Sequence, residues 1–339
     1  MKSAIFNAPL NISVEDVETP SDVDETTAIV KVKACGICGT DLHMYKLGLF
    51  TDEYCRFTEK GPAPGHEFSG EVVKVHEDTN DLKVGDRVVA VLFGAMAEYI
   101  SVIAAPELLY KLPPEVSDEE GATLEPLANS LHAARKGNPR DGENVVIFGA
   151  GIIGLGLVQC LRAMDINLNK IIVVDYSNHR LEVAKDCGAD EVINAGVDDP
   201  FEKIINIVGE DTALYKPDHV CAQVDIIYDC VGFMKERPGV PVLQQAINLV
   251  KDVNGRIVVH GMFEDEISLD LYPFLLKQVA VLGSYAFTRE DMLDSIEYIK
   301  NKQIDRARLI SHMFPLEKVK EAFDVQCRTE ESVKVLVIP

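Results

Sequence analysis

Three short stretches, far apart along the chain, carry side chains that could bind one metal ion together. They read CGICGTDLHMY, PGHEFSG and LEPL. Among their residues Cys38 offers a thiolate, His66 an imidazole, and Glu67 and Glu125 one carboxylate each. Zinc takes all three ligand types, and a catalytic zinc keeps one position open for water or substrate. We therefore predict a catalytic zinc site built from Cys38, His66, Glu67 and Glu125.

The residues leave open which glutamate is the third ligand. His66 and Glu67 are neighbours, and on a regular strand their side chains would point to opposite faces. Both reach one ion only if the chain bends there, which Pro64 and Gly65 would permit. Glu125 begins a helix farther along the chain and is the alternative ligand. The two carboxylates could also exchange at the metal during turnover.

The pair Cys35 and Cys38 also fits other kinds of site. It could be half of a four-cysteine zinc site, but the sequence lacks the second close pair that such a site needs. A redox-active pair is another interpretation, although nothing around it indicates a thioredoxin-like unit. Taken alone, a cysteine usually packs in a core, and a histidine is more often hydrogen-bonded there than bound to metal. The joint occurrence with a second motif favours zinc.

That second motif is a glycine-rich turn typical of dinucleotide binding. In VVIFGAGIIG, Gly149, Gly151 and Gly154 form the pattern G-x-G-x-x-G between an apolar strand and a helix. The first glycine permits a tight turn, the second lets the backbone approach a pyrophosphate, and the third allows close packing of the helix. The start of the helix offers N–H groups and the positive end of its dipole to the phosphates. A glycine-rich turn in an unrelated α/β fold is the alternative.

An acidic residue at the end of the next strand indicates which cofactor binds. Asp175 closes KIIVVD, about twenty residues after the glycines, where an acid can accept hydrogen bonds from the ribose hydroxyls. The 2′-phosphate of NADP would be repelled there, so we expect NAD. Arg180 lies close in sequence and could accommodate that phosphate instead, which makes NADP the second choice.

Length and charge limit the classes of protein to which the chain could belong. Its 339 residues exceed what one core usually supports, so we expect two domains. A net charge of −22 without a basic block argues against nucleic-acid and membrane partners. We see no signal peptide and no membrane span in the sequence. Eight scattered cysteines fit free thiols in a reducing cytoplasm, where we expect the protein.

The pattern of apolar residues changes along the chain. The first part contains short strands such as TAIVKVKAC, GEVVKVH and DRVVAVLF, with no long helical pattern before Ser117. Ser117 and Glu120 have the spacing of a capping box, and Gly121 should break or kink the helix that follows. From about Asn144 strands alternate with helices, which predicts a parallel sheet covered on both faces. Residues 209–223 are expected to form an irregular surface insertion, and the chain ends with two helices and the strand VKVLVIP.

In these residues the chain resembles the zinc-containing medium-chain dehydrogenase/reductase family, and most of all its sorbitol (polyol) dehydrogenase branch. The resemblance runs nearly end to end, through CGICGTDLHMY, GHEFSGEVV, GDRVV, LEPL, FGAGIIG, VVDYSNHRL, AKDCGAD and SVKVLVIP. It implies an α/β protein with a GroES-like β-barrel catalytic domain, formed by residues 1–127 and 288–339. A Rossmann domain with a doubly wound parallel sheet, residues 128–287, would separate these two segments.

The resemblance also implies roles for single residues. The residues matching Cys38 and His66 bind zinc, and the glutamates matching Glu67 and Glu125 bind it directly or through water. Cys35 matches no ligand.

Proton transfer and cofactor binding are implied in the same way. Thr40 matches the residue that accepts the alcohol proton, which passes through the cofactor ribose to the position of His43. Further residues match positions that line the NAD site: Ile153, Asp175, Arg180, Gly261, Ser284 and Tyr285.

The chain departs from the family pattern in two places. Many members carry a lobe with four cysteines that bind a structural zinc, but here GDRVVAVLFGAMAEYI runs straight across that position. We therefore predict one catalytic zinc and no structural zinc. The arginine that polyol dehydrogenases place near the substrate falls at Ala286, so sorbitol itself is not implied. Arg56 and Lys60 could meet an anionic substrate group, although solvated loop positions are the better interpretation.

Together these features predict an enzyme that transfers a hydride between NAD and a secondary alcohol, such as a polyol, a sugar alcohol or a related hydroxy compound. The metal would act as a Lewis acid on the substrate hydroxyl, and the cofactor would carry the hydride. We expect a small-molecule substrate and a homodimer or homotetramer. The alternatives are a zinc-free quinone or enone reductase and a non-catalytic cofactor-binding protein on the same fold.

Overall fold

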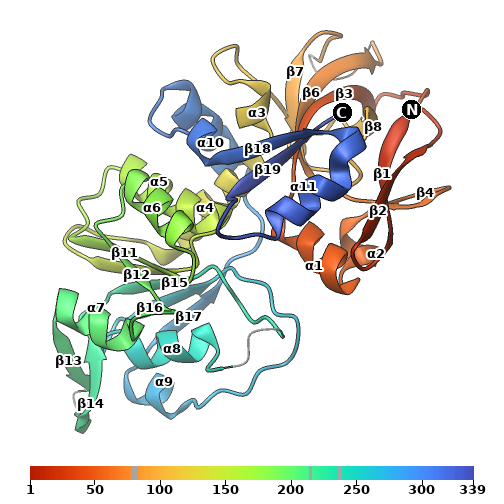
Figure 1. Cartoon of the computed structure of the whole chain (residues 1–339). Coiled ribbons are helices and arrows are strands. Elements are labelled where there is room, and N and C mark those ends of the chain that lie inside the picture. The colour runs from red at the N-terminus through yellow and green to blue at the C-terminus, as the bar shows by residue number, and fades with distance from the viewer. Residues whose placement is uncertain (78, 80–81, 214–215, 236–238) are drawn as a thin grey trace. The chain divides into compact units, whose positions relative to one another are not determined.

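A β-rich unit and an α/β unit make up the computed structural model, which describes residues 1–77, 79, 82–213, 216–235 and 239–339 (Figure 1). Unit 1 contains Met1–Ala128 and Thr288–Pro339, so it is assembled from both ends of the sequence. Unit 2 contains Asn129–Phe287.

Strands form the framework of unit 1 and pack around its main hydrophobic core. Its strands are β1 (Lys2–Ala8), β2 (Asn11–Asp16), β3 (Thr27–Gly36), β4 (Arg56–Thr58), β5 (Gly61–Ala63), β6 (Glu67–Val75), β7 (Arg87–Ala90), β8 (Tyr99–Ile103), β9 (Leu109–Lys111), β18 (Ile310–Pro315) and β19 (Lys334–Ile338). The main sheet has the order β18-β19-β3-β6-β7-β9, and β8 also pairs with β3. The two C-terminal strands therefore lie in one sheet with strands from the start of the chain, as the blue and red ribbons of Figure 1 show.

The helices of unit 1 are short and sit between strands. They are α1 (Gly39–Leu47), α2 (Thr51–Tyr54), α3 (Asp118–Gly121), α10 (Arg289–Lys300) and α11 (Val319–Gln326). The nine-residue helix α1 was not anticipated among the predicted strands, because its apolar positions do not form a clear helical stripe. The capping box is present as expected, since the Glu120 N–H donates to Ser117 Oγ and the Ser117 N–H donates to the Glu120 carboxylate. Helix α3 ends at Gly121, and α4 (Leu124–Gly137) begins three residues later.

Unit 2 is a parallel sheet whose strand order reverses in the middle. Its strands are β10 (Asn144–Phe148), β11 (Lys170–Asp175), β12 (Glu191–Asn194), β15 (Ile226–Asp229), β16 (Arg256–Val259) and β17 (Ala280–Gly283), in the order β12-β11-β10-β15-β16-β17. All neighbouring pairs are parallel. The chain thus builds outward from β10 in one direction and then from β15 in the other, which confirms the predicted doubly wound fold. Ligands of such sheets bind outside the carboxyl ends of the strands, where the order reverses.

Helices connect these strands. They are α5 (Ile152–Ala163), α6 (Asn178–Asp186), α7 (Pro200–Val208), α8 (Val242–Leu249) and α9 (Tyr272–Leu276). The strands β10 and β11 are buried along nearly their whole length, which explains their continuous apolar sequence. Each of α6 and α7 begins at a side-chain cap: Ser177 Oγ accepts the Arg180 N–H, and Asp199 Oδ1 accepts the Phe201 N–H.

The predicted irregular insertion at residues 209–223 is wrong. That segment forms an antiparallel hairpin of β13 (Glu210–Ala213) and β14 (Lys216–Ala222), whose tip at residues 214–215 lies outside the described residues. Cys221 on β14 is fully buried. The strand signal was missed because polar residues and a proline interrupt the apolar pattern.

None of the helices formed by the described residues combines the length and the hydropathy that crossing a bilayer requires.

Candidate active site

Strand register brings the predicted metal ligands together in unit 1. In the antiparallel pair β3–β6, Gly36 lies opposite Glu67, so the chain just after β3 is next to the chain just before β6. Cys38 and His66 occupy these two positions. Gly65 has a φ of +91°, and a Cβ there would lie 2.7 Å from the side chain of Met96, so only glycine fits the bend. Because His66 precedes the strand and Glu67 begins it, both side chains can face one point.

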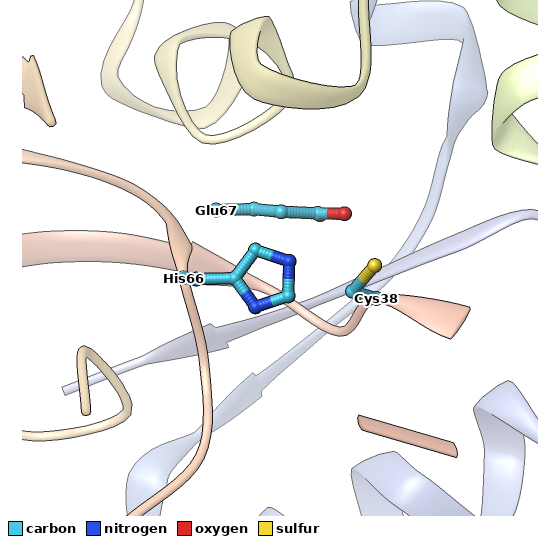
Figure 2. Close-up of side chains that lie close together, drawn as sticks. All are labelled: Cys38, His66 and Glu67. Atoms are coloured by element: carbon cyan, nitrogen blue, oxygen red, sulfur yellow. The ribbon is translucent and has the colours of Figure 1, made fainter. Parts of the chain in front are cut away.

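Cys38, His66 and Glu67 form a compact group of candidate ligand atoms. One sulfur, one ring nitrogen and one carboxylate oxygen all lie within 4.8 Å of one another, and Figure 2 shows the three side chains converging. Among the described residues, it is the group of three or more histidine, cysteine or acidic side chains close enough together to hold a metal ion. Glu125 is not part of it, but its charge acts on His66. The structure therefore brings three of the four predicted ligands into contact range and leaves Glu125 nearby at the start of α4.

A buried aspartate joins the two segments that carry Cys38 and His66. Asp41 is 1% exposed, and its carboxylate accepts the Cys38 N–H at 2.9 Å and the Gly65 N–H at 3.1 Å. The first bond also caps α1, which begins directly after Cys38. One side chain thus fixes both the start of the helix and the bend before His66.

A buried lysine holds the third candidate ligand. Lys334, at the start of β19, places its Nζ 2.5 Å from Glu67 Oε2 and 2.8 Å from the carbonyl oxygen of Ile37. Both charged side chains are buried: 1% of the Lys334 side chain and 0% of the Glu67 side chain is exposed. Pairing of β19 with β3 sets this position, because Leu336 lies opposite Gly36. The other carboxylate oxygen, Glu67 Oε1, has no hydrogen-bond partner.

Charges in this cluster are crowded. Burial raises the pKa of the Cys38 thiol, and the Glu67 carboxylate raises it further. Burial alone would lower the pKa of His66, but the charges of Cys38, Asp41 and Glu125 bring it well above its usual value. In the absence of a cation, Cys38 and His66 therefore keep their protons. A divalent cation would displace these protons, since metal ligands bind in their deprotonated form.

Unsatisfied polar atoms indicate that a zinc ion fits here. His66 Nδ1 and Glu67 Oε1 are buried without a hydrogen-bond partner, a costly arrangement unless another group pairs with them. Thiolate, imidazole and carboxylate are also the ligand set that zinc takes. Thr40 Oγ1, in the first turn of α1, is buried and unpartnered as well. His43 follows three residues later on the same helix face.

Cys35 stays outside the cluster, as expected. It is fully buried, and its sulfur lies 3.7 Å from the carbonyl oxygen of Gly36. Burial raises the pKa of its thiol well above the usual value, which makes it an unreactive packing residue.

The glycine-rich turn in unit 2 has the geometry that a pyrophosphate needs. Gly149 has a φ of +98°, and Gly151 is the N-cap of α5, which Ile153 and Gly154 continue. A side chain at Gly154 would collide with the carbonyl oxygen of Gly149, so the helix can approach the strand only with glycine there. The helix start therefore leaves its first N–H groups open toward the carboxyl end of β10.

The expected ribose acid is fixed by the same turn. Asp175 ends β11, and its carboxylate accepts the Ala150 N–H at 2.6 Å and the Ser177 N–H at 2.9 Å. A Cβ built on Gly151 would lie 3.9 Å from Nη1 of Arg180, so this guanidinium is close to the phosphate turn. Asp175 also lines a hollow of about 170 Å³ with Gly149, Tyr176 and Phe233.

The remaining predicted cofactor residues follow the next strands of the sheet. Gly261 comes after β16, and its Cα approaches the backbone of Gly232 so closely that a side chain would not fit. Ser284 and Tyr285 follow β17, with Ser284 buried and Tyr285 71% exposed. All of them thus lie at the carboxyl edge where nucleotide ligands of this fold bind.

Comparison with known proteins identifies the family. Residues 24–114 match the alcohol dehydrogenase GroES-like domain, and residues 153–301 match the zinc-binding dehydrogenase domain. An L-idonate 5-dehydrogenase of Vitis vinifera is 31% identical over 91% of this chain and 86% of its own length. The chain belongs to the zinc-containing medium-chain dehydrogenase/reductase family. Within it, the chain falls in the polyol dehydrogenase-like branch, and the predicted GroES-like and Rossmann architecture is confirmed.

Solved structures of this dehydrogenase family agree along the whole chain. The (R,R)-butanediol dehydrogenase of Bacillus subtilis is 30% identical over the full length of both proteins. The crystal structure of the 2R,3R-butanediol dehydrogenase from that organism has a TM-score of 0.82, covering 100% of this chain and 99% of that one. An Escherichia coli alcohol dehydrogenase solved with NADH is 25% identical, with a TM-score of 0.81 and coverage of 100% and 99%. This medium-chain dehydrogenase is therefore an oxidoreductase of the zinc-binding, NAD(P)-linked kind.

Sequence reasoning missed three residues that shape the sites of this dehydrogenase. The position of Asp41, three residues after Cys38, has capping-box spacing and could have been recognised. His260, directly after β16, has its Nδ1 3.4 Å from Ser284 Oγ, and burial lowers its pKa to about 4, with His132 adding to the effect. The partner of Glu67, Lys334, is 267 residues away and leaves no local signal.

We predict that Lys334→Met lowers the free energy of unfolding of the metal-free protein by about 3–5 kcal/mol, because it leaves the buried Glu67 carboxylate without a counter-ion. Urea unfolding measures this change. Lys2→Met is the matched control, because it breaks the exposed Lys2–Glu317 pair, which solvent screens, so its loss should change the free energy of unfolding much less. Equal losses in the two variants would contradict the assigned role of Lys334.

Proposed function

We propose that this protein is an NAD-dependent zinc alcohol dehydrogenase that oxidises a secondary hydroxyl of a small polyol or diol. The observation that carries the proposal is the convergence of Cys38, His66 and Glu67, with buried unpartnered atoms on His66 and Glu67. Related proteins are named for L-idonate, sorbitol and (R,R)-butanediol, which all carry several hydroxyl groups on a short carbon chain.

Cys38, His66 and Glu67 would hold one catalytic zinc, with the carboxylate of Glu125, the fourth predicted ligand, within electrostatic reach of His66. When bound, zinc supplies Lewis-acid polarisation of the substrate hydroxyl and lowers its pKa. Lys334 pairs with one oxygen of Glu67, so the other oxygen, which has no hydrogen-bond partner, would remain available to the metal.

The residues of α1 would handle the proton. The buried Thr40 hydroxyl has no partner of its own, so it can accept a hydrogen bond from the substrate hydroxyl. His43, one helical turn later, would receive the proton and pass it to water. Residues at the carboxyl edge of the unit 2 sheet would hold the nicotinamide cofactor, which would supply the hydride acceptor.

We predict that Cys38→Ala lowers bound zinc from about one ion per chain to nearly none and abolishes NADH formation from polyols. NADH binding should persist, because the nucleotide residues lie in unit 2. Elemental analysis and NADH fluorescence titration measure the two effects. Cys35→Ala is the control, since Cys35 is absent from the cluster, and should retain zinc. A wild-type protein that oxidises polyols after complete zinc removal would contradict the proposal.

NAD is favoured over NADP by the carboxylate of Asp175. A 2′-phosphate would meet this negative charge, which the backbone N–H groups of Ala150 and Ser177 hold in place. We predict that Asp175→Ser shifts the ratio of kcat/KM for NADP over NAD upward by roughly tenfold to a hundredfold, equivalent to about 1.4–2.8 kcal/mol. Steady-state kinetics with both cofactors measure the ratio. Glu182→Gln, on the exposed side of α6, should leave it unchanged.

We also propose that two copies of the chain associate through β17. This edge strand, with the sequence AVLG, contains no charge and no proline, the devices that usually protect an open edge. Ala280 and Ser284 donate their N–H groups to the carbonyls of Gly255 and Val259 near β16. By alternation, the N–H groups of Val281 and Gly283 face the open edge.

We predict that wild-type protein elutes as a dimer or a tetramer and that Val281→Lys shifts it toward the monomer, because two ammonium groups would meet at the paired edges. Light scattering after size-exclusion chromatography measures the mass. Val197→Lys introduces the same charge at another exposed position of unit 2 and should leave the mass unchanged. A monomeric wild type would disprove the association.

A further inference from the structure

A buried carboxylate supports the turn that follows β15 in unit 2. Asp229 is the last residue of β15 and is fully buried. Its Oδ1 accepts the Val231 N–H at 3.0 Å and the Gly232 N–H at 2.8 Å. Gly232 has a φ of +70°, and a Cβ there would collide with the carbonyl oxygen of Met262, so the turn is tight. One oxygen of Asp229 therefore holds two N–H groups of this turn.

This turn forms one wall of the hollow that Asp175 also lines. Three of its residues take part: Val231, Gly232 and Phe233. A Cβ built on Gly149 would lie 2.9 Å from Cγ2 of Val231, so the turn is in direct contact with the glycine-rich turn. Dinucleotides of this fold place their pyrophosphate at that glycine-rich turn. Asp229 thus fixes a wall beside the expected pyrophosphate position.

The second oxygen of the same carboxylate is buried without a hydrogen-bond partner. This atom is Oδ2 of Asp229. A carboxylate in such a position is costly, because its charge is removed from water and only one of its oxygens is compensated. Burial raises the pKa of Asp229 to about 6, although the two N–H groups act in the opposite direction. The group therefore changes its charge around pH 6.

The neighbouring strands do not balance this charge. Phe148 on β10 and Val259 on β16 are the register partners of Asp229. Cys230 follows it in the chain, and burial together with the carboxylate charge raises the pKa of this thiol well above its usual value. The ring of His260, directly after β16, is neutral around pH 6, because burial lowers its pKa to about 4.

The loop after β16 packs against the turn and holds its own charges in other contacts. The Phe233 N–H donates to the carbonyl oxygen of Met262 at 3.0 Å. Glu264 accepts the Lys235 N–H at 2.7 Å, and the Lys235 ammonium pairs with Asp265 at 3.1 Å. Within the described residues, burial and the two N–H groups set the pKa of Asp229, with no charged side chain among the causes.

A bound dinucleotide changes the charge around this carboxyl group. Its pyrophosphate brings negative charge to the glycine-rich turn, which Val231 contacts. A like charge nearby disfavours the ionised form of a buried carboxyl group and raises its pKa. By linkage, the dinucleotide then binds more tightly to the protein in which Asp229 is protonated.

We propose that Asp229 is a positioning residue of the nucleotide site and that its ionisation weakens dinucleotide binding, so the protein takes up a proton from solvent when the dinucleotide binds. The proton goes to the unpartnered oxygen Oδ2. Asp229 acts through the turn at Val231 and Gly232 and through its own charge. This inference rests on the proposed function and adds a dependence on pH to it.

The first test is the dissociation constant for NADH from fluorescence titration between about pH 5 and pH 8. For the wild type we expect this constant to rise by roughly threefold to tenfold across the range. Asp229→Asn keeps an acceptor oxygen for the two N–H groups and has no charge, so the rise should be absent. Asp229→Ala also removes the acceptor and should weaken binding by roughly tenfold at every pH in the range.

Proton uptake gives a second test that requires no variant. Calorimetric titration of the wild type with NADH, in two buffers of different ionisation heat, measures the protons bound with each dinucleotide. At about pH 6.5 we expect uptake of roughly 0.3 to 0.5 proton per chain, falling toward zero below about pH 4.5.

A matched control comes from an exposed carboxylate that supports a turn of unit 1. Asp24 Oδ1 accepts the Thr26 N–H at 2.8 Å, far along the sequence from the nucleotide residues. Asp24→Asn makes the same chemical change as Asp229→Asn. It should leave both the pH dependence of NADH affinity and the proton uptake as they are in the wild type.

Two results would overturn the inference and leave the zinc dehydrogenase proposal standing. One is NADH binding by the wild type without proton uptake at about pH 6.5. The other is a folded Asp229→Asn variant whose NADH affinity changes with pH as much as that of the wild type. A wild type that binds no NADH at any pH would instead overturn the proposed function, and this inference with it.

Discussion

The unit 1 site depends on one buried ion pair, between Lys334 and Glu67. Two charges without access to water are stable only when each meets a partner of opposite sign and its other hydrogen-bonding groups are satisfied. Lys334 meets this condition through Glu67 and the carbonyl of Ile37, but Glu67 meets it through only one of its oxygens. The unsatisfied oxygen is the one that remains for a metal. Pairing of β19 with β3 thus places Lys334 against one oxygen of Glu67, and only the other oxygen remains open to a further partner.

The charges around the metal cluster form a balanced set only when a cation is included. Asp41 contributes a second buried carboxylate, and its two oxygens are used by backbone N–H groups. Cys38 and His66 keep protons that a cation would release. Lys334 supplies one positive charge against several acidic groups, so a divalent ion brings the site close to neutrality. Under the proposed zinc binding, uptake of the metal is therefore coupled to the burial of these acidic groups.

Local patterns in the sequence predicted the features that a few neighbouring residues determine. The glycines at 149, 151 and 154, the acid at the end of β11 and the capping box before α3 each have a fixed spacing, and the structure has the corresponding turn, strand end and helix start. The bend at Gly65 also follows from local chemistry, because two adjacent ligands cannot share one face of a strand.

Features that arise from distant residues could not be found in this way. The pairing of Lys334 with Glu67 requires the strand order of the sheet, which no local pattern contains. The contacting rings of Phe50, Tyr54 and Phe93 come from a helix cap, a helix end and a loop, so their contacts appear only in three dimensions. The hairpin of β13 and β14 was missed because its residues have weak β-propensity, and it is the pairing of the two strands that stabilises them.

The split of unit 1 between the two ends of the sequence affects how the protein matures. During translation the ribosome releases Glu67 long before Lys334, which is 267 residues further along. Unit 2 is continuous in sequence and can fold while the remainder is still being synthesised. Until β19 emerges, the nascent chain exposes an unpaired edge of β3 and a carboxylate without its counter-ion. The buried surroundings of Glu67 are therefore complete only after the last strand of the chain has been synthesised.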